Sequence, residues 1–180
     1  MTALGPFNRF RDIPQFTRSA AYKCEQSWRY LEGWLADQDD PGCQQVLVLD
    51  PDFQRAHVWN EKQQIRYVEF ILRGGQSSRD LYFNHPRWND DFRGELVLVD
   101  GKQRLQAVRR FLANEIPAFG RLYGEYADKL PHDCAFTVHI NNLKTRKEVL
   151  QWYIDLNAGG VAHTEEEIAK VYALLLKEAA

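Results

Sequence analysis

The chain has 180 residues, of which 44% are hydrophobic and 13% aromatic, so it has enough apolar residues for a core and is not a disordered segment. Its formal net charge of -2 argues against the strongly basic surface that marks the simplest DNA-binding proteins. The apolar runs are too short to cross a bilayer, and residues 1–6 lack the layout of a signal peptide, which predicts a soluble cytoplasmic protein. The three widely spaced cysteines predict neither a disulfide framework nor a metal clip.

The first third of the chain predicts two helices and a strand. Residues 1–20 contain two prolines and are expected to be irregular, whereas apolar residues between 22 and 36 recur with helical spacing and predict a helix. The run 46–49 is typical of a buried strand. A second helix should begin at Asn60, because Gln63 stands at the position of a capping box.

The rest of the chain predicts further strands alternating with helices. Residues 84–94 are rich in turn formers and predict a loop between two strands. The predicted strands are 80–83, 95–100 and 135–140, and the predicted helices are 105–112, 146–156 and a last one capped by Thr164. No repeat or linker divides the chain. The sum is a single α+β domain, residues 1–180, with a small mixed sheet of about four strands and flanking helices.

The most informative stretch is DGKQRL, residues 100–105, where a hydrophobic strand meets a helix at a glycine. The amide groups of a first helical turn carry the positive end of the helix dipole, so Gly101 opens a turn that suits a phosphate. Lys102 and Arg104 add positive charge, and Asp100 is a candidate either to hold Mg²⁺ or to orient an attacking water. The alternative is an ordinary strand end followed by solvated cations.

Two other segments offer candidate ligand contacts. Gln54 and Arg55 are donors for phosphate or base edges, and Trp59 offers a flat face for stacking, although a tryptophan here is more often part of the core. Asn157 precedes the glycines of a helix–helix turn and is the one polar residue there that capping does not explain. The sequence contains no Walker loop, no GxGxxG and no HExxH, which excludes ordinary P-loop, Rossmann and zincin sites.

The order of three motifs resembles a known family. FQRAHVW at 53–59, DGKQRL at 100–105 and NAGG at 157–160 are similar to the DGQQR-signature proteins, the GmrSD-type N-terminal domains, over residues 46–168. These domains are related in fold to the ParB and sulfiredoxin superfamily. The resemblance implies a ParB-like fold and a role in restriction or anti-phage defence. It also implies binding and hydrolysis of nucleoside triphosphates, with Mg²⁺ as the expected cofactor.

The resemblance carries roles to individual residues. Asp100, Gln103 and Arg104 match the catalytic loop, and Asp100 is the expected Mg²⁺ ligand. The phosphate-binding residues would be Gln54, Arg55, Gly101, Lys102, Arg104 and Asn157. Lys102 departs from the usual Gln of the signature and adds a charge there. No nuclease motif follows, so we expect a sensor or regulator that works with a nuclease or another defence-system subunit.

Two alternatives stay open beside the nucleotide-binding enzyme. Residues 51–110 are the only third of the chain with more basic than acidic residues, which would suit a ParB-like module that binds DNA. A non-catalytic interaction or decoy protein would keep the fold and lack the chemistry.

Overall fold

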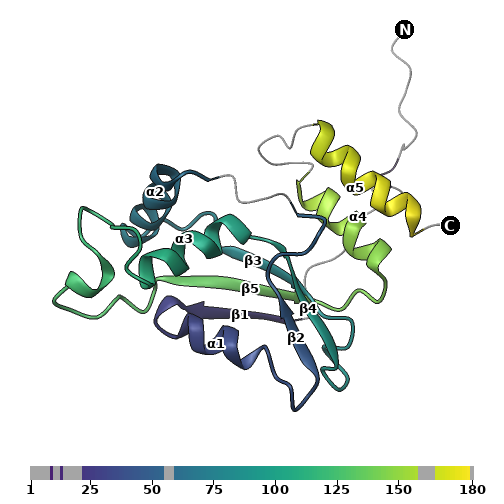
Figure 1. Ribbon diagram of the computed structural model, residues 1–180, viewed down its shortest axis with the longest axis horizontal. Coiled ribbons are helices and arrows are strands. Elements are labelled where there is room, and N and C mark those ends of the chain that lie inside the picture. Colours follow the sequence, from purple (N-terminus) through teal and green to yellow (C-terminus); the bar gives the residue numbers. More distant parts are fainter. Residues whose placement is uncertain (1–8, 10–12, 14–21, 55–58, 158–164, 179–180) are drawn as a thin grey trace, which may run out of the picture.

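One five-stranded mixed sheet organises the chain (Figure 1). The computed structural model describes residues 9, 13, 22–54, 59–157 and 165–178. The strands are β1 (Tyr22–Ser27), β2 (Gln45–Val48), β3 (Asp80–Asn84), β4 (Gly94–Asp100) and β5 (Ala135–Asn141), in the spatial order β1-β5-β3-β4-β2. The pairs β1–β5 and β3–β4 are antiparallel, whereas β3–β5 and β2–β4 are parallel.

Helices cover the two faces of the sheet unequally. They are α1 (Leu31–Asp37), α2 (Glu61–Leu72), α3 (Lys102–Leu112), α4 (Arg146–Asn157) and α5 (Glu165–Lys177), with 3₁₀ turns at Trp28–Tyr30 and Tyr123–Glu125. Apolar residues of α1, α2 and α3 share one buried cluster with Leu81 and Phe83 of β3. Residues of α4 and α5 form a second cluster with Tyr82, Val97 and Val99 on the opposite face (Figure 1). Successive side chains of a strand point to opposite faces, which is why Tyr82 belongs to a different cluster from its two neighbours.

Most of the predicted elements are confirmed. The capping box is present: Asn60 accepts a hydrogen bond from the Gln63 amide at 3.0 Å, and the Gln63 side chain accepts one from the Asn60 amide at 2.9 Å. The α2 helix ends before Gly74, whose φ of 84° is typical of a glycine that follows a helix. The predicted loop joins the antiparallel strands β3 and β4.

The helix predicted over residues 22–36 is wrong in its first half. Residues 22–27 form strand β1, and the helix begins only at Leu31 after a 3₁₀ turn. The local pattern from Tyr22 to Gln26 alternates between less and more polar residues, and pairing with β5 uses that alternation. The sheet therefore has five strands in place of the four predicted, and the additional one is an edge strand.

Some predictions concern residues outside the described part. The irregular segment predicted at 1–20 (apart from residues 9 and 13) and the Thr164 cap lie outside it. Within it, no helix combines the length and the apolar character that crossing a bilayer would require.

A buried histidine holds the loop between β3 and β4. The His85 side chain is fully buried, and its Nδ1 accepts a hydrogen bond from the Arg87 amide at 3.0 Å. Nε2 therefore carries the proton of the neutral ring and donates to the carbonyl of Phe92 at 3.0 Å. Burial lowers the pKa of His85 below its ordinary value of 6.5.

This histidine should make the protein less stable in mild acid. In the unfolded chain this histidine is protonated below about pH 6.5, whereas in the folded protein the buried His85 stays neutral to a lower pH. The free energy of unfolding should therefore fall as the pH drops below about 6.5, by at most about 1.4 kcal/mol per pH unit. Urea unfolding between pH 7.5 and 5 measures the slope. The His85→Asn variant should show a shallower slope than wild type, because it lacks the buried imidazole. Equal slopes in wild type and His85→Asn would contradict this assignment.

Candidate functional site

The chain passes from β4 into α3 through a single glycine. Gly101 has φ 110° and ψ 3°, a left-handed conformation. A Cβ atom at this position would lie 2.4 Å from Cδ2 of Leu81 and 3.3 Å from the carbonyl oxygen of Asp80. The backbone conformation and the close approach to β3 both require glycine. The Leu105 amide donates to the Gly101 carbonyl at 2.9 Å, so the helix starts as soon as the strand ends.

A β-bulge beside this turn sets the direction of Asp100. In the β3–β4 ladder, Phe83 pairs with Leu98 and Tyr82 pairs with Asp100, which leaves Val99 as the additional residue. An extra residue in one strand bends that strand and re-aims the side chains that follow it. Asp100 therefore stands directly opposite Tyr82 at the edge of the sheet.

The guanidinium group of Arg104 is held against the same edge. Nη2 of Arg104 donates to Oδ2 of Asp100 at 2.5 Å, and Nε donates to the carbonyl oxygen of Asp80 at 3.1 Å. The Arg104 side chain is only 20% exposed. One side chain thus joins the end of β4 to the start of β3, and its charge lies in the first turn of α3, near the positive end of the helix dipole.

Lys102 reaches across to the neighbouring parallel strand. Val48 of β2 lies opposite Val97 of β4, and because the two strands are parallel, their carboxyl ends meet at one edge. Asp50 follows the end of β2, and its Oδ1 accepts a hydrogen bond from Nζ of Lys102. The site therefore contains an acidic residue, Asp50, to which no sequence motif had assigned a role.

Gln54 and Gln103, the glutamines of the two motifs, contact backbone groups. Gln54 is buried and its Nε2 donates to the carbonyl of Leu98 in β4 at 2.6 Å. Gln103 accepts a hydrogen bond from the Trp59 amide at 3.1 Å. Arg55 lies outside the described residues, but these two contacts attach the residues on either side of segment 55–58 to β4 and α3.

Trp59 and Asn157 are placed by packing and by local bonds. The Trp59 ring packs on the core and lies 5.4 Å from the Tyr67 ring, at an angle of 56°. Asn157 is the last residue of α4 and donates from Nδ2 to the Tyr153 carbonyl at 2.7 Å. Tyr153 in turn packs edge-on against Phe53, with ring centroids 5.3 Å apart. The described contacts thus connect the end of α4 with the FQR motif but not directly with the turn at Gly101.

Three further polar residues that motif analysis missed lie at this edge. Nε2 of His139 is 2.6 Å from Oδ1 of Asp80, and the His139 ring stacks on Tyr82 with centroids 4.6 Å apart. Burial raises the pKa of Tyr82, the carboxylates of Asp80 and Asp100 raise it further, and Arg104 opposes them. The strands that carry these residues were predicted, but only the parallel pairing of β3 with β5 brings Asp80 and His139 together.

The described side chains at the turn suit a Mg²⁺ ion that binds together with a phosphate ligand. They do not form a complete coordination shell for a metal ion by themselves. No group of three or more His, Cys, Asp or Glu side chains suited to a metal ion occurs in the described ranges. Mg²⁺ is commonly held by one or two carboxylates together with phosphate oxygens. Asp100 fits that role because its side chain is 32% exposed and only its Oδ2 is hydrogen-bonded within the described part of the chain.

Comparison with known proteins identifies the family. The family described as GmrSD restriction endonuclease, N-terminal domain, matches residues 34–133, more than half of the chain. The chain belongs to this family. The resemblance stated from the motifs is thereby confirmed, and it relates the chain to restriction-type defence systems. No curated protein and no solved structure matches it.

The match to the GmrSD N-terminal domain covers the main part of the candidate site. It runs from α1 to the residues just before β5 and includes Gln54, Trp59 and the turn at Gly101. It does not include Asn157 or His139. The observed mixed sheet agrees with the α+β expectation, while the ParB-like relationship stays a prediction.

Replacing Gly101 tests the geometry of the turn. Gly101→Ala forces a Cβ into Leu81 and the Asp80 carbonyl on a left-handed backbone, and should destabilise the protein by roughly 1–3 kcal/mol. Thermal or urea unfolding measures the change. Gly33→Ala in α1 is the matched control, since its Cβ meets no atom within 4 Å and should leave stability equal or raise it by up to about 1 kcal/mol. Gly101→Ala with wild-type stability would show that the turn does not approach β3 so closely.

Proposed function

We propose that this protein binds a nucleoside triphosphate with Mg²⁺ at the turn between β4 and α3 and hydrolyses it. Within a restriction-type defence system it would act as the nucleotide-dependent sensor or regulator of a nuclease or another subunit. The family assignment supports the type of system. The residues at the turn support the chemistry.

The observation that carries the proposal is the fixed position of Arg104. Its largely buried guanidinium is bonded to Asp100 and to the Asp80 carbonyl, beside the helix end that attracts anions. A guanidinium held in this way loses little freedom when it binds a phosphate oxygen, and it can make paired hydrogen bonds. Lys102 adds a second cation on the side of β2.

The carboxylates divide the remaining tasks. Asp100 would hold Mg²⁺, which when bound neutralises charge on the phosphate groups. Asp50 keeps Lys102 at the edge until a phosphate replaces the carboxylate as its partner. The contacts of Gln54 and Gln103 attach residues 54 and 59 to β4 and α3. Arg55 would be a further phosphate-binding cation.

Hydrolysis at this site requires stabilisation of developing negative charge. Attack of water on the γ-phosphorus breaks its bond to the bridging oxygen and releases phosphate and a nucleoside diphosphate. Arg104 and Lys102 donate hydrogen bonds to the oxygens that gain charge, and Asp100 is the candidate to orient the water if it does not hold the metal. No contact within the described residues specifically favours the DNA-binding alternative.

Arg104→Ala is the direct test. Loss of a charged hydrogen-bond donor should weaken binding of Mg²⁺–nucleoside triphosphate by about 1.5–3 kcal/mol, roughly a 10- to 150-fold rise in Kd, and should abolish phosphate release. Calorimetric titration and a phosphate-release assay measure the two effects. Asp100→Asn should reduce phosphate release more than binding, because an amide keeps the size of the side chain but loses its charge.

Arg109→Ala is the matched control. Arg109 lies on the same helix, but its side chain is 43% exposed and pairs with Glu32 away from the turn. Its removal should leave nucleotide binding and turnover at the wild-type level. Wild-type activity in Arg104→Ala, or equal losses in the two arginine variants, would refute the proposed site.

A further inference from the structure

A cavity of about 450 Å³ lies between the sheet and the start of α4, on the face opposite α3. Its sheet side includes Val48 of β2 and Val97 of β4, which are direct partners in the parallel ladder. Phe53 and Val149 line it from the chain after β2 and from α4. The cavity thus has apolar walls of the kind against which a flat ring packs, and its volume is in the range of small-molecule sites.

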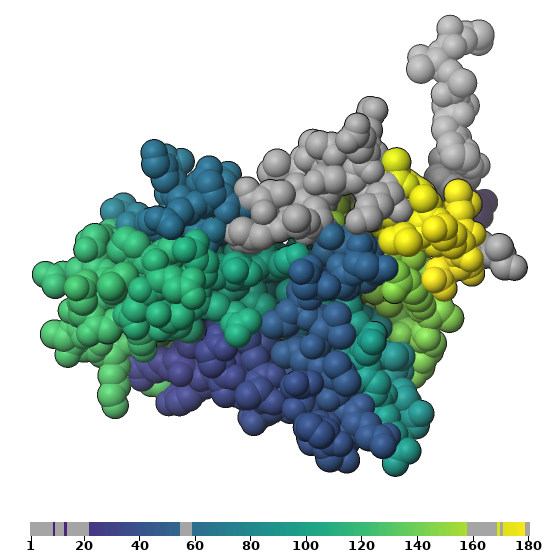
Figure 2. Space-filling model, viewed as in Figure 1, coloured from purple at the N-terminus to yellow at the C-terminus, as the bar shows by residue number. Residues whose placement is uncertain are grey.

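The basic residues around this cavity are already paired with other groups of the protein, and the remaining charged residues are acidic. Arg146 lies with Nη2 at 2.8 Å from both carboxylate oxygens of Asp52 and with Nε at 3.3 Å from Glu178. Figure 2 shows the resulting contact, with the residues after β2 directly beside α5. Two carboxylates face this arginine while one faces Arg104, so Arg146 is less suited than Arg104 to bind a phosphate.

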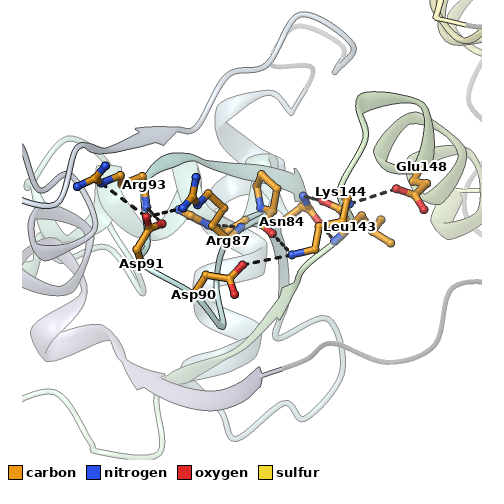
Figure 3. A network of polar contacts seen from close by, with 10 residues as sticks. Asn84, Arg87, Asp90, Asp91, Arg93, Leu143, Lys144 and Glu148 are labelled. Atoms are coloured by element: carbon orange, nitrogen blue, oxygen red, sulfur yellow. Dashed lines mark hydrogen bonds and ion pairs between the residues drawn. The ribbon is translucent and has the colours of Figure 1, made fainter.

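The lysine at the cavity is also engaged. Nζ of Lys144 lies 3.5 Å from Oδ2 of Asp90 and donates to the carbonyl of Pro86 (Figure 3). The amides of residues 144 and 145 at the start of α4 both donate to Glu148, so the helix end is capped by its own side chain. Asn84, at the cavity wall, both donates to and accepts from the backbone of Leu143 (Figure 3).

The carboxylates of Glu95 and Asp50 complete the lining. Glu95 makes no hydrogen bond or ion pair in the described part of the chain, and it lies two residues before Val97 on the same face of β4. With Asp50, Asp52 and Glu95 against Lys144 and Arg146, the lining carries more negative than positive charge. Such a cavity repels phosphate and favours a neutral group that offers N–H or O–H donors.

Asp50 connects the cavity to the turn at Gly101. Its carboxylate lines the cavity, and the same carboxylate accepts the hydrogen bond from Lys102 at the start of α3. Val97 precedes Gly101 by four residues, about 13 Å along an extended strand. The cavity and the phosphate site proposed above are therefore neighbours, and a single elongated ligand could occupy both.

We propose that this cavity holds the nucleoside half of the nucleoside triphosphate whose phosphates lie at the turn, an inference that rests on the proposed function. The base packs against Val48 and Val97, and Glu95 accepts a hydrogen bond from an N–H group of the base. Asp50, at the end nearer the turn, accepts one from a ribose hydroxyl. The division follows from the groups present: Lys102, Arg104 and a Mg²⁺ ion held by Asp100 take the triphosphate at the turn, and the acidic cavity takes the neutral end.

Filling the cavity should separate nucleoside recognition from phosphate recognition. With Mg²⁺ present, Val48→Phe should raise the Kd for nucleoside triphosphates at least tenfold and leave the Kd for inorganic tripolyphosphate within twofold of wild type. Ala36→Phe is the control for adding an aromatic ring elsewhere, because Ala36 is exposed on α1 and does not line the cavity. It should bind both ligands as wild type does.

Glu95→Gln provides a second variant at an exposed position, where folding is not at risk. It should weaken nucleoside triphosphate binding severalfold and leave tripolyphosphate binding unchanged. Unchanged nucleotide affinity in both variants, or equal losses of the two ligands in Val48→Phe, would overturn the cavity assignment. Wild-type protein that binds tripolyphosphate as tightly as nucleotide would overturn it too. Wild-type protein that binds neither ligand would instead remove the proposed function, and this inference with it.

Discussion

The close approach of the chain to β3 at Gly101 is the constraint on which the candidate site depends. Glycine has no Cβ to clash with Leu81 and readily adopts the left-handed conformation of Gly101, which lets the strand turn into α3 without an intervening loop. Arg104, in the first turn of that helix, is then close enough to reach both Asp100 and the Asp80 carbonyl. A longer connection would let the helix start drift from the sheet edge, and the cation would no longer be fixed relative to the carboxylate.

The Lys102–Asp50 ion pair can exchange its acidic partner for a ligand at low cost. The Asp50 side chain is 75% exposed while that of Lys102 is 15% exposed, and a pair that is open to water on one side is screened and contributes only about 0–1 kcal/mol. A phosphate oxygen that replaces a carboxylate as partner therefore gives up little. At this edge the carboxylates of Asp50, Asp80 and Asp100 outnumber the two cations, Lys102 and Arg104, which disfavours a bare polyanion. A phosphate chain that brings its own divalent cation is better matched to such a balance.

The motifs locate the turn but not the groups that the turn contacts. Asp100, Lys102 and Arg104 are predicted ligand groups, and the structure shows that each of them also takes part in an ion pair. Asp50 and Asp80 carry no motif, and they join the site only because β2 and β3 flank β4 in the sheet. Gln54 is a predicted phosphate-binding residue and Gln103 a predicted catalytic residue, and the structure adds a contact of each with a backbone group of the fold. Spacing along the chain says nothing about such partners, because they come from distant strands.

Local chemistry in the sequence was sufficient to determine the α2 capping box, the β4 strand with its glycine turn, and the family. The capping box and the glycine turn each depend on residues within a few positions of one another, and the family was indicated by the order of three short motifs. Tertiary structure alone decided the role of residues 22–27, since a strand at the edge of a sheet is stabilised by its partner and not by its own pattern. Tertiary structure also decided the strand order, the bulge at Val99 and the cavity that Asp50 helps to line. These features arise from contacts between segments that are far apart in sequence.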